Sequence, residues 1–285
     1  MSLQTPPEPL LAPVIDSHCH LDLLERGMRG DEAPDEDPDA MLALAASVGV
    51  TKVVQIGCTV EAARWSVEMA VSRPDVIVGV ALHPNEAPRI VANEGPAALE
   101  RAYEAIAHLA SHDVVRAVGE TGLDYFRTED VAAARAVQQD SFRWHIALAK
   151  TLNKTLVIHD RESHDDVMNV LESEGAPDRV VFHCFSGDAQ MAARCAERGW
   201  YMSFAGVITF KNADDLRAAL RVVPDELLLV ETDSPYLTPV PHRGKANGSY
   251  LMPLTVRRMA AERGVGEAQL AAMLWRNTQQ VFGAW

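Results

Sequence analysis

Eight short apolar runs, separated by stretches with helical spacing, constrain this sequence more than any other feature. The runs are predicted to be strands at 14–17, 52–56, 76–82, 114–118, 155–158, 179–182, 200–204 and 227–230. Several are apolar without alternation, as expected for parallel strands that are buried on both faces. Eight strand–helix units predict an α/β chain of the TIM (β/α)8 barrel type. The alternative is a doubly wound open sheet, but the first strand–helix turn lacks the GxGxxG fingerprint of its dinucleotide-binding form.

The stretches between the strands have apolar residues at helical spacing. Helices are predicted at 39–48, 60–72, 97–111, 129–152, 163–173, 189–198, 213–221, 250–263 and 266–282. A chain of 285 residues suits one barrel domain over 14–285, preceded by a flexible, Pro-rich tail at 1–13. An acidic insertion at 29–39 follows the first strand. We expect a solvated surface loop there, and the alternative is a mobile flap over the site.

Metal-binding residue types gather at the ends of six predicted strands. They are His18, His20, His83, Glu120, His159, His183 and Asp233. Active sites of TIM barrels are built at the carboxyl ends of the strands. Residues i and i+2 of a strand point to the same face, so the first two histidines converge. Because neutral imidazole is the commonest nitrogen ligand for divalent metals, these positions predict a metal site.

This ligand set predicts a metallo-dependent hydrolase with one or two divalent metal ions. Glu120, central in the strand order, suits a carboxylate that bridges two metals. The first two histidines and Asp233 are expected to bind one metal, and His159 and His183 the other. Asp233 is also expected to orient the attacking water and accept its proton. On ligand type the set suits Zn, Mn, Fe or Ni and suits Mg²⁺ less well, so the identity of the metal stays open.

Cations near the strand ends matter if the substrate carries phosphate. Arg161 comes two residues after His159, Lys211 follows the seventh strand, and Arg243 follows the eighth. We interpret these cations and His83 as candidate substrate-binding residues. The alternative for the cations is a solvated or ion-paired surface position. His83 could instead orient a ligand, or only cap the strand end before Pro84.

Other carboxylates lie close enough in sequence to support the ligands. They are Asp16, Asp160 and Glu231, and metal-bound histidines usually donate their second N–H to such an acceptor. Ion pairs inside the barrel are the alternative. The four cysteines have no CxxC spacing, which favours reduced, buried side chains in a cytoplasmic protein.

Composition limits the partners. The net charge of −14 argues against a general duplex-binding surface, although metals and a few cations can hold a nucleic acid locally. No apolar run approaches the length of a membrane span, and the first residues lack the pattern of a secretion signal. We therefore expect a cytoplasmic protein with no membrane contact and no obligate protein partner.

Seven motifs, taken together and in order, resemble the TatD family of metal-dependent DNases. They are DSHCHLD at 16–22, GETGLDY at 119–125, IHDR at 158–161, HCFSG at 183–187, ITFKNA at 208–213, ETDSPYL at 231–237 and HRGKAN at 242–247. The resemblance covers nearly the whole chain. It implies a TIM barrel of the amidohydrolase superfamily that hydrolyses DNA phosphodiesters, often from the 3′ end of single strands.

The resemblance also implies a ligand set, which agrees with the one expected from the strand ends. The implied ligands are His18, His20, Glu120, His159, His183 and Asp233. In many related amidohydrolases a carboxylated lysine takes the bridging position that Glu120 takes here. The sequence departs from the family after Asn247, where Gly248-Ser249 replaces the frequent Glu-Pro. We expect this departure to alter the loop after the eighth strand.

Three functions remain as hypotheses. The first is a TatD-type deoxyribonuclease, a 3′–5′ exonuclease acting on single-stranded or short DNA, in which a metal-activated water attacks phosphorus. The second is an amidohydrolase that acts on a small ester, lactone or amide with the same metals. The third is a non-catalytic binding protein with a structural metal. Closed structural sites are usually Cys- or His-dominated and tetrahedral, which disfavours the third hypothesis.

Overall fold

The computed structural model describes residues 3–23, 37–128 and 132–285. Their contacts divide the chain into two compact units. The first unit consists of Met1–Gln55 and Cys184–Trp285, and the second of Ile56–His183. Residues 29–36 of the acidic insertion, and the predicted helix start at 129–131, lie outside the described residues.

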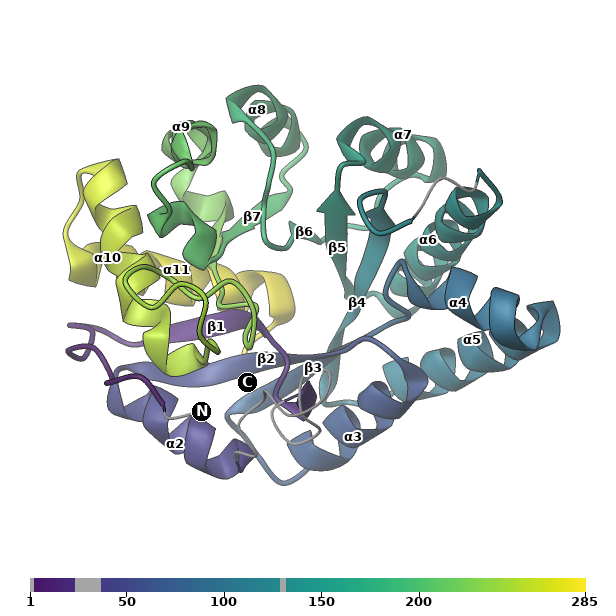
Figure 1. The fold of residues 1–285 in the computed structure, drawn as a ribbon, viewed down its shortest axis with the longest axis horizontal. Helices are drawn as coiled ribbons and strands as arrows, with labels where there is room; N and C mark the ends of the chain where they lie inside the picture. Colours follow the sequence, from purple (N-terminus) through teal and green to yellow (C-terminus); the bar gives the residue numbers. More distant parts are fainter. Residues whose placement is uncertain (1–2, 24–36, 129–131) are drawn as a thin grey trace. The chain divides into compact units, whose positions relative to one another are not determined.

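Eight strands form one sheet in which the strand order follows the chain, and helices alternate with them (Figure 1). The strands are β1 (Val14–Cys19), β2 (Val50–Gly57), β3 (Val76–Val80), β4 (Val115–Asp124), β5 (Thr155–Arg161), β6 (Val180–Phe182), β7 (Tyr201–Phe204) and β8 (Leu228–Val230). Within the first unit, a parallel bridge between Cys19 and Ser234 makes the first and last strands neighbours. This strand order confirms the predicted α/β TIM (β/α)8 fold.

The helices begin where the sequence supplies capping groups. Thr59 accepts the N–H of Ala62 at the start of α3, and Asp188 accepts that of Met191 at the start of α8. The helices are α2 (Pro38–Ser47), α3 (Val60–Ala70), α4 (Glu86–Glu94), α5 (Pro96–Ala110), α6 (Ala132–Leu152), α7 (His164–Glu174), α8 (Ala189–Glu197), α9 (Asp214–Val222), α10 (Met252–Arg263) and α11 (Glu267–Phe282).

The sequence prediction is wrong about where two central strands end. β4 continues to Asp124 and β5 to Arg161, so Glu120 and His159 lie inside their strands rather than after them. Pairing continues along this extension, with Thr121 opposite Ile158 and Asp124 opposite Arg161. The polar residues in both extensions concealed them, because a buried parallel strand is expected to be apolar.

Helix α4 is absent from the sequence prediction, which has only 97–111 between the third and fourth strands. Its third residue is Pro88, which argues against a helix in a pattern-based prediction. A proline in the first helical turn removes no intrahelical hydrogen bond, so the helix tolerates it. Ala87 and Ile90, three positions apart, are the buried residues of α4.

Each unit has its own buried core. In the first unit α11 packs on β1 and β8, and Leu274 and Val281 of this helix are fully buried. In the second unit α6 packs on β4 and β5, with Phe142 fully buried. Among the described residues, no helix combines the length and the apolar composition needed to cross a membrane.

Part of the predicted tail at 1–13 packs against other residues of the first unit. Leu10 is buried and donates its N–H to the Val48 carbonyl. Gln4 is also buried and bonds to the Tyr250 hydroxyl. The flexibility of this segment in solution stays a prediction.

The four cysteines form no disulfide. Cys19 and Cys195 are buried as predicted, whereas Cys58 and Cys184 are partly exposed.

Candidate metal-binding active site

The first unit brings together three of the predicted ligands. His18 and His20 lie at the carboxyl end of β1, and Asp233 follows β8. The Nε2 atoms of the two histidines are 3.3 Å apart. The Asp233 Oδ1 atom lies 3.4 Å from Nε2 of His20 and 3.8 Å from Nε2 of His18.

These distances fit three ligands of one metal ion. Two donor atoms held at the usual bond length on a tetrahedral metal lie about 3.3 Å apart. The atoms of this first ligand set (His18, His20 and Asp233) are 3.3–3.8 Å apart, and all three belong to residue types that bind divalent metals. The first ligand set therefore fits a divalent cation.

Backbone contacts between neighbouring strands position the first ligand set. The Asp233 N–H donates to the His18 carbonyl at 2.9 Å, and the His20 N–H donates to the Ser234 carbonyl at 2.8 Å. Asp233 itself has a φ of 52°, a left-handed conformation that is uncommon for residues other than glycine. The carboxylate is thus placed by a sharp turn immediately after β8.

Asp16 ties β1 to this turn. Its buried carboxylate accepts the Thr232 N–H at 2.9 Å, the Thr232 hydroxyl at 2.5 Å, the Ser249 hydroxyl at 2.7 Å and the His18 N–H at 3.2 Å. Burial raises the pKa of Asp16 to about 7, against the lowering effect of these hydrogen bonds. The bond to His18 is made by the backbone N–H rather than by the ring. Ser249, where the sequence departs from the family pattern, supplies one of the donors.

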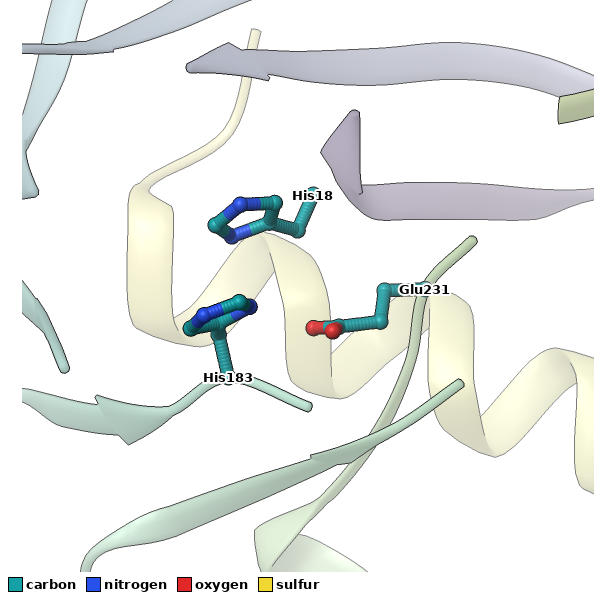
Figure 2. Close-up of side chains that lie close together, drawn as sticks. All are labelled: His18, His183 and Glu231. Carbon is teal, nitrogen blue, oxygen red and sulfur yellow. The ribbon is translucent and has the colours of Figure 1, made fainter. Parts of the chain in front are cut away.

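Glu231 also lies near His18. The two side chains offer ligand atoms within 4.8 Å of each other, and Figure 2 labels both. Glu231 is fully buried, and its Oε1 accepts the Cys184 N–H at 2.7 Å. Strand alternation in the sequence predicted that Glu231 and Asp233 would share a face. Glu231 was therefore a candidate acceptor for the N–H of a metal-bound histidine.

The second unit brings together the other predicted ligands around Glu120. Its Oε1 lies 2.5 Å from Nδ1 of His159 and 3.0 Å from Nε2 of His183. Those two imidazole nitrogens are 3.3 Å apart. His183, also labelled in Figure 2, follows β6, whereas the other two side chains belong to β4 and β5. This second ligand set (Glu120, His159 and His183) has donor types that bind divalent cations, and its two imidazole nitrogens have the spacing of ligands on one metal, whereas Glu120 and His159 are at hydrogen-bond distance.

His83 joins the second ligand set on the side of β3. Its Nε2 lies 3.4 Å from Oε1 of Glu120, and its Nδ1 accepts the Asn85 N–H at 3.1 Å. Burial lowers the pKa of His83, which favours the neutral ring. With Nδ1 accepting, the neutral ring carries its proton on Nε2 and presents it to Glu120. Its binding of substrate stays a prediction.

Asp124 is a site residue that the sequence analysis missed. Its Oδ2 lies 3.4 Å from Nε2 of His159 and accepts the Asn85 side-chain amide at 3.1 Å. Burial would raise the pKa of Asp124, but the nearby His159 ring and the hydrogen bond from the Arg127 N–H lower it well below its usual range. Asp124 is four residues after Glu120 on one strand, so alternation could have revealed it.

The two carboxylates hold His159 from both ends of its ring. Burial lowers the pKa of His159, yet the Asp124 and Glu120 carboxylates beside its two ring nitrogens outweigh that effect and raise the pKa overall. Gly122 is needed opposite the His159 backbone, because a Cβ there would collide with the His159 carbonyl and the glycine has a φ of +141°. This is the acceptor–histidine arrangement that fixes the ring orientation in metal sites.

The predicted phosphate-binding cations are exposed. The Arg161 guanidinium lies 3.9 Å from the centre of the Phe126 ring, and that of Arg243 lies 4.4 Å from the centre of the Phe210 ring. Lys211 follows the 3₁₀ helix η1 (Gly206–Thr209). Asp160, predicted as a supporting acceptor, receives hydrogen bonds from Ser163 and His164.

A TIM barrel with sets of His and carboxylate ligands at its strand ends has the fold and the candidate site of a metal-dependent hydrolase. The family described as "TatD related DNase" matches residues 15–283. The chain therefore belongs to the TatD family, as the sequence motifs predicted.

Relatives and solved structures agree with this assignment. The chain is 42% identical to an uncharacterized metal-dependent hydrolase TatD of Mycobacterium tuberculosis, over 95% of this chain and 98% of the relative. It is 36% identical to the metal-dependent hydrolase YcfH of Escherichia coli K12, over 94% and 95% of the two chains. The crystal structure of the Escherichia coli TatD homolog YJJV aligns with a TM-score of 0.82 at 25% identity, covering 95% and 98%. The protein is a metal-dependent hydrolase.

Proposed function

We propose that this hydrolase cleaves DNA phosphodiester bonds as a 3′–5′ exonuclease on single-stranded ends. The observation that carries the proposal is the match of residues 15–283 to a family described as TatD related DNase. The exposed Arg161 at the end of β5 adds support, because phosphate oxygens pair well with guanidinium groups. The partner is accordingly single-stranded or short DNA, and the acidic net charge of −14 disfavours long duplex.

Each side chain has a proposed role. Asp233 accepts the proton of the attacking water, while Arg161, Lys211 and Arg243 bind phosphate oxygens. His18 and His20 hold one cation with Asp233, and His159 and His183 hold another with Glu120. A divalent metal, when bound, supplies electrostatic stabilisation of the phosphate and a lower pKa for water. The bridging position of Glu120 between two metals stays a prediction.

Metal identity and location complete the proposal. The mixed imidazole and carboxylate donors suit Mn²⁺ or Zn²⁺, and Mg²⁺ suits them less because it prefers oxygen ligands. We propose a cytoplasmic location, where the cysteines stay reduced. No obligate protein partner is included in the proposal.

The test is degradation of a single-stranded oligonucleotide by the metal-stripped protein after Mg²⁺, Mn²⁺ or Zn²⁺ is restored singly. A 5′ label reports progressive shortening from the 3′ end, and a phosphorothioate linkage at that end should stop it. Glu120→Ala and Asp233→Ala remove one carboxylate from each ligand set. Glu104→Ala and Asp215→Ala remove exposed carboxylates of the same two units and serve as matched controls.

We expect metal-dependent release of nucleotides by the parent and by both controls, and loss of release in both ligand variants. A metal-loaded, folded parent that releases no nucleotide from DNA would refute the nuclease proposal. Small esters, lactones and amides would then be tested as substrates. Shortening from the 5′ end would refute the proposed polarity alone.

A further inference from the structure

An exposed aromatic ring with a cation stacked on it follows β4 in the second unit. The Phe126 side chain is 55% exposed, which makes it one of the few large apolar side chains at the surface. The Arg161 guanidinium lies 3.9 Å from the centre of this ring. A ring this exposed keeps part of its apolar surface in water, where a ligand can cover it and gain the free energy of burial.

The position of this pair relates it to the second ligand set. Asp124 at the end of β4 pairs with Arg161 at the end of β5, and the Tyr125 N–H donates to the Arg161 carbonyl at 2.9 Å. Phe126 is thus two residues beyond the carboxylate that contacts His159, and Arg161 is two residues beyond His159 itself. The stacked pair lies at the strand ends that carry the ligands.

The charge of Arg161 is available for a ligand. Many surface arginines of this acidic chain bind carboxylates, as Arg89, Arg143 and Arg258 do. Within residues 3–23, 37–128 and 132–285, Arg161 forms no ion pair with a carboxylate and contacts the Phe126 ring instead. Arg243 stacks in the same way in the first unit, but on Phe210, which is only partly exposed. Of these two stacked rings, Phe126 therefore has the larger exposed fraction.

We propose that Phe126 and Arg161 form a nucleotide-binding subsite for single-stranded DNA. The base stacks on the exposed part of the Phe126 ring, and the Arg161 guanidinium binds an adjacent phosphate. A ring beside a cation matches the two parts of a nucleotide, and stacking of this kind tolerates any base. The inference rests on the proposed nuclease function and adds a base-binding residue to it.

The experiment compares Phe126→Leu with the parent on two single-stranded oligonucleotides of equal length. One is unmodified. The other is made as a series in which a single abasic site occupies successive positions, counted from the 3′ end. Phe126→Leu keeps an apolar side chain but removes the π-face, and Phe126→Trp restores one. Val71→Ala, at an exposed apolar position after α3, is the matched control. Binding to fluorescent oligonucleotide is also measured in a chelator, independently of hydrolysis.

We expect Phe126→Leu to raise KM and the dissociation constant about 5- to 100-fold, the range of one stacking contact, with a smaller effect on kcat. An abasic site at one position should weaken binding to the parent and to Phe126→Trp but have little further effect on Phe126→Leu. A parent that cleaves DNA with no loss in Phe126→Leu, or with the same abasic penalty in both proteins, would overturn this inference alone. A parent that neither binds nor cleaves DNA would overturn the proposed function, and this inference with it.

Discussion

Acidification should destabilise the fold through a single buried histidine, His145 of α6. The side chain is fully buried. Its Nδ1 donates to the Ser141 carbonyl at 2.7 Å, and its Nε2 accepts the Leu82 N–H at 3.1 Å. These contacts require the neutral ring with its proton on Nδ1. A second proton on Nε2 would point at the Leu82 N–H, so protonation breaks this hydrogen bond.

The size of the effect follows from the pKa. Burial lowers the pKa of His145 from 6.5 to about 4. A group with a lowered folded-state pKa binds protons more readily when unfolded, so its stabilisation is complete above pH 6.5 and is lost as pH falls toward 4. Between about pH 7.5 and about pH 5 the free energy of unfolding should fall by about 2 kcal/mol from this residue.

The assay is urea unfolding of the metal-free protein at several pH values, with His145→Gln beside the parent. Glutamine can accept the Leu82 N–H but does not titrate. The parent–variant difference isolates His145, because other titrating groups cancel when they are distant. The free energy of unfolding of the parent minus that of His145→Gln should decrease by about 2 kcal/mol between about pH 7.5 and about pH 5.

The control is His108→Gln, which removes an exposed imidazole of α5 and leaves the Leu82 contact intact. The free energy of unfolding of His108→Gln should change with pH as that of the parent does. A parent–His145→Gln difference that is the same at both ends of that range would refute the reasoning, because it would show that His145 binds no additional proton on unfolding.

Three further predictions concern the ligand sets and the core. Asp124→Asn should weaken metal binding at the second ligand set about 10- to 100-fold, as loss of a histidine-orienting acceptor usually does; chelator competition measures this, with Asp165→Asn as control. His20→Ala should lower the metal content per chain, measured by mass spectrometry after dialysis, and an unchanged content would contradict its assignment. Phe142→Ala should reduce the free energy of unfolding by about 3–5 kcal/mol in urea titrations, because it empties a fully buried site.

Apolar runs in the sequence were sufficient to predict the existence and order of all eight strands. The apolar runs did not predict where β4 and β5 end, and these strand ends carry candidate ligands. β4 runs on through Gly119–Asp124 because its polar side chains are buried against the site, and hydropathy alone cannot distinguish such a segment from a loop. Helix α4 was missed because Pro88 is compatible with a first turn but not with a helix interior.

The candidate ligands were predictable because their residue types are few and recur at strand ends. Asp16 was also named from the sequence as a supporting carboxylate, but the residues that it contacts were not predicted. The Asp16 carboxylate accepts the backbone N–H and the side-chain hydroxyl of Thr232, across more than two hundred residues of sequence. Ser249 contributes to the same contact from a position where the sequence departs from its family. Such partners are determined by the tertiary fold, and spacing along the chain carries no signal for them.

The composition of the ligand sets follows from strand adjacency. β1 and β8 are neighbours within the first unit, and their ends carry the first ligand set. β4, β5 and β6 pair consecutively within the second unit and carry the second ligand set. Each set is therefore brought together by the hydrogen bonds of its own strands. This explains why the sequence could predict which candidate ligands lie together: in a sheet whose order follows the chain, neighbouring strand ends are known once the strands are counted.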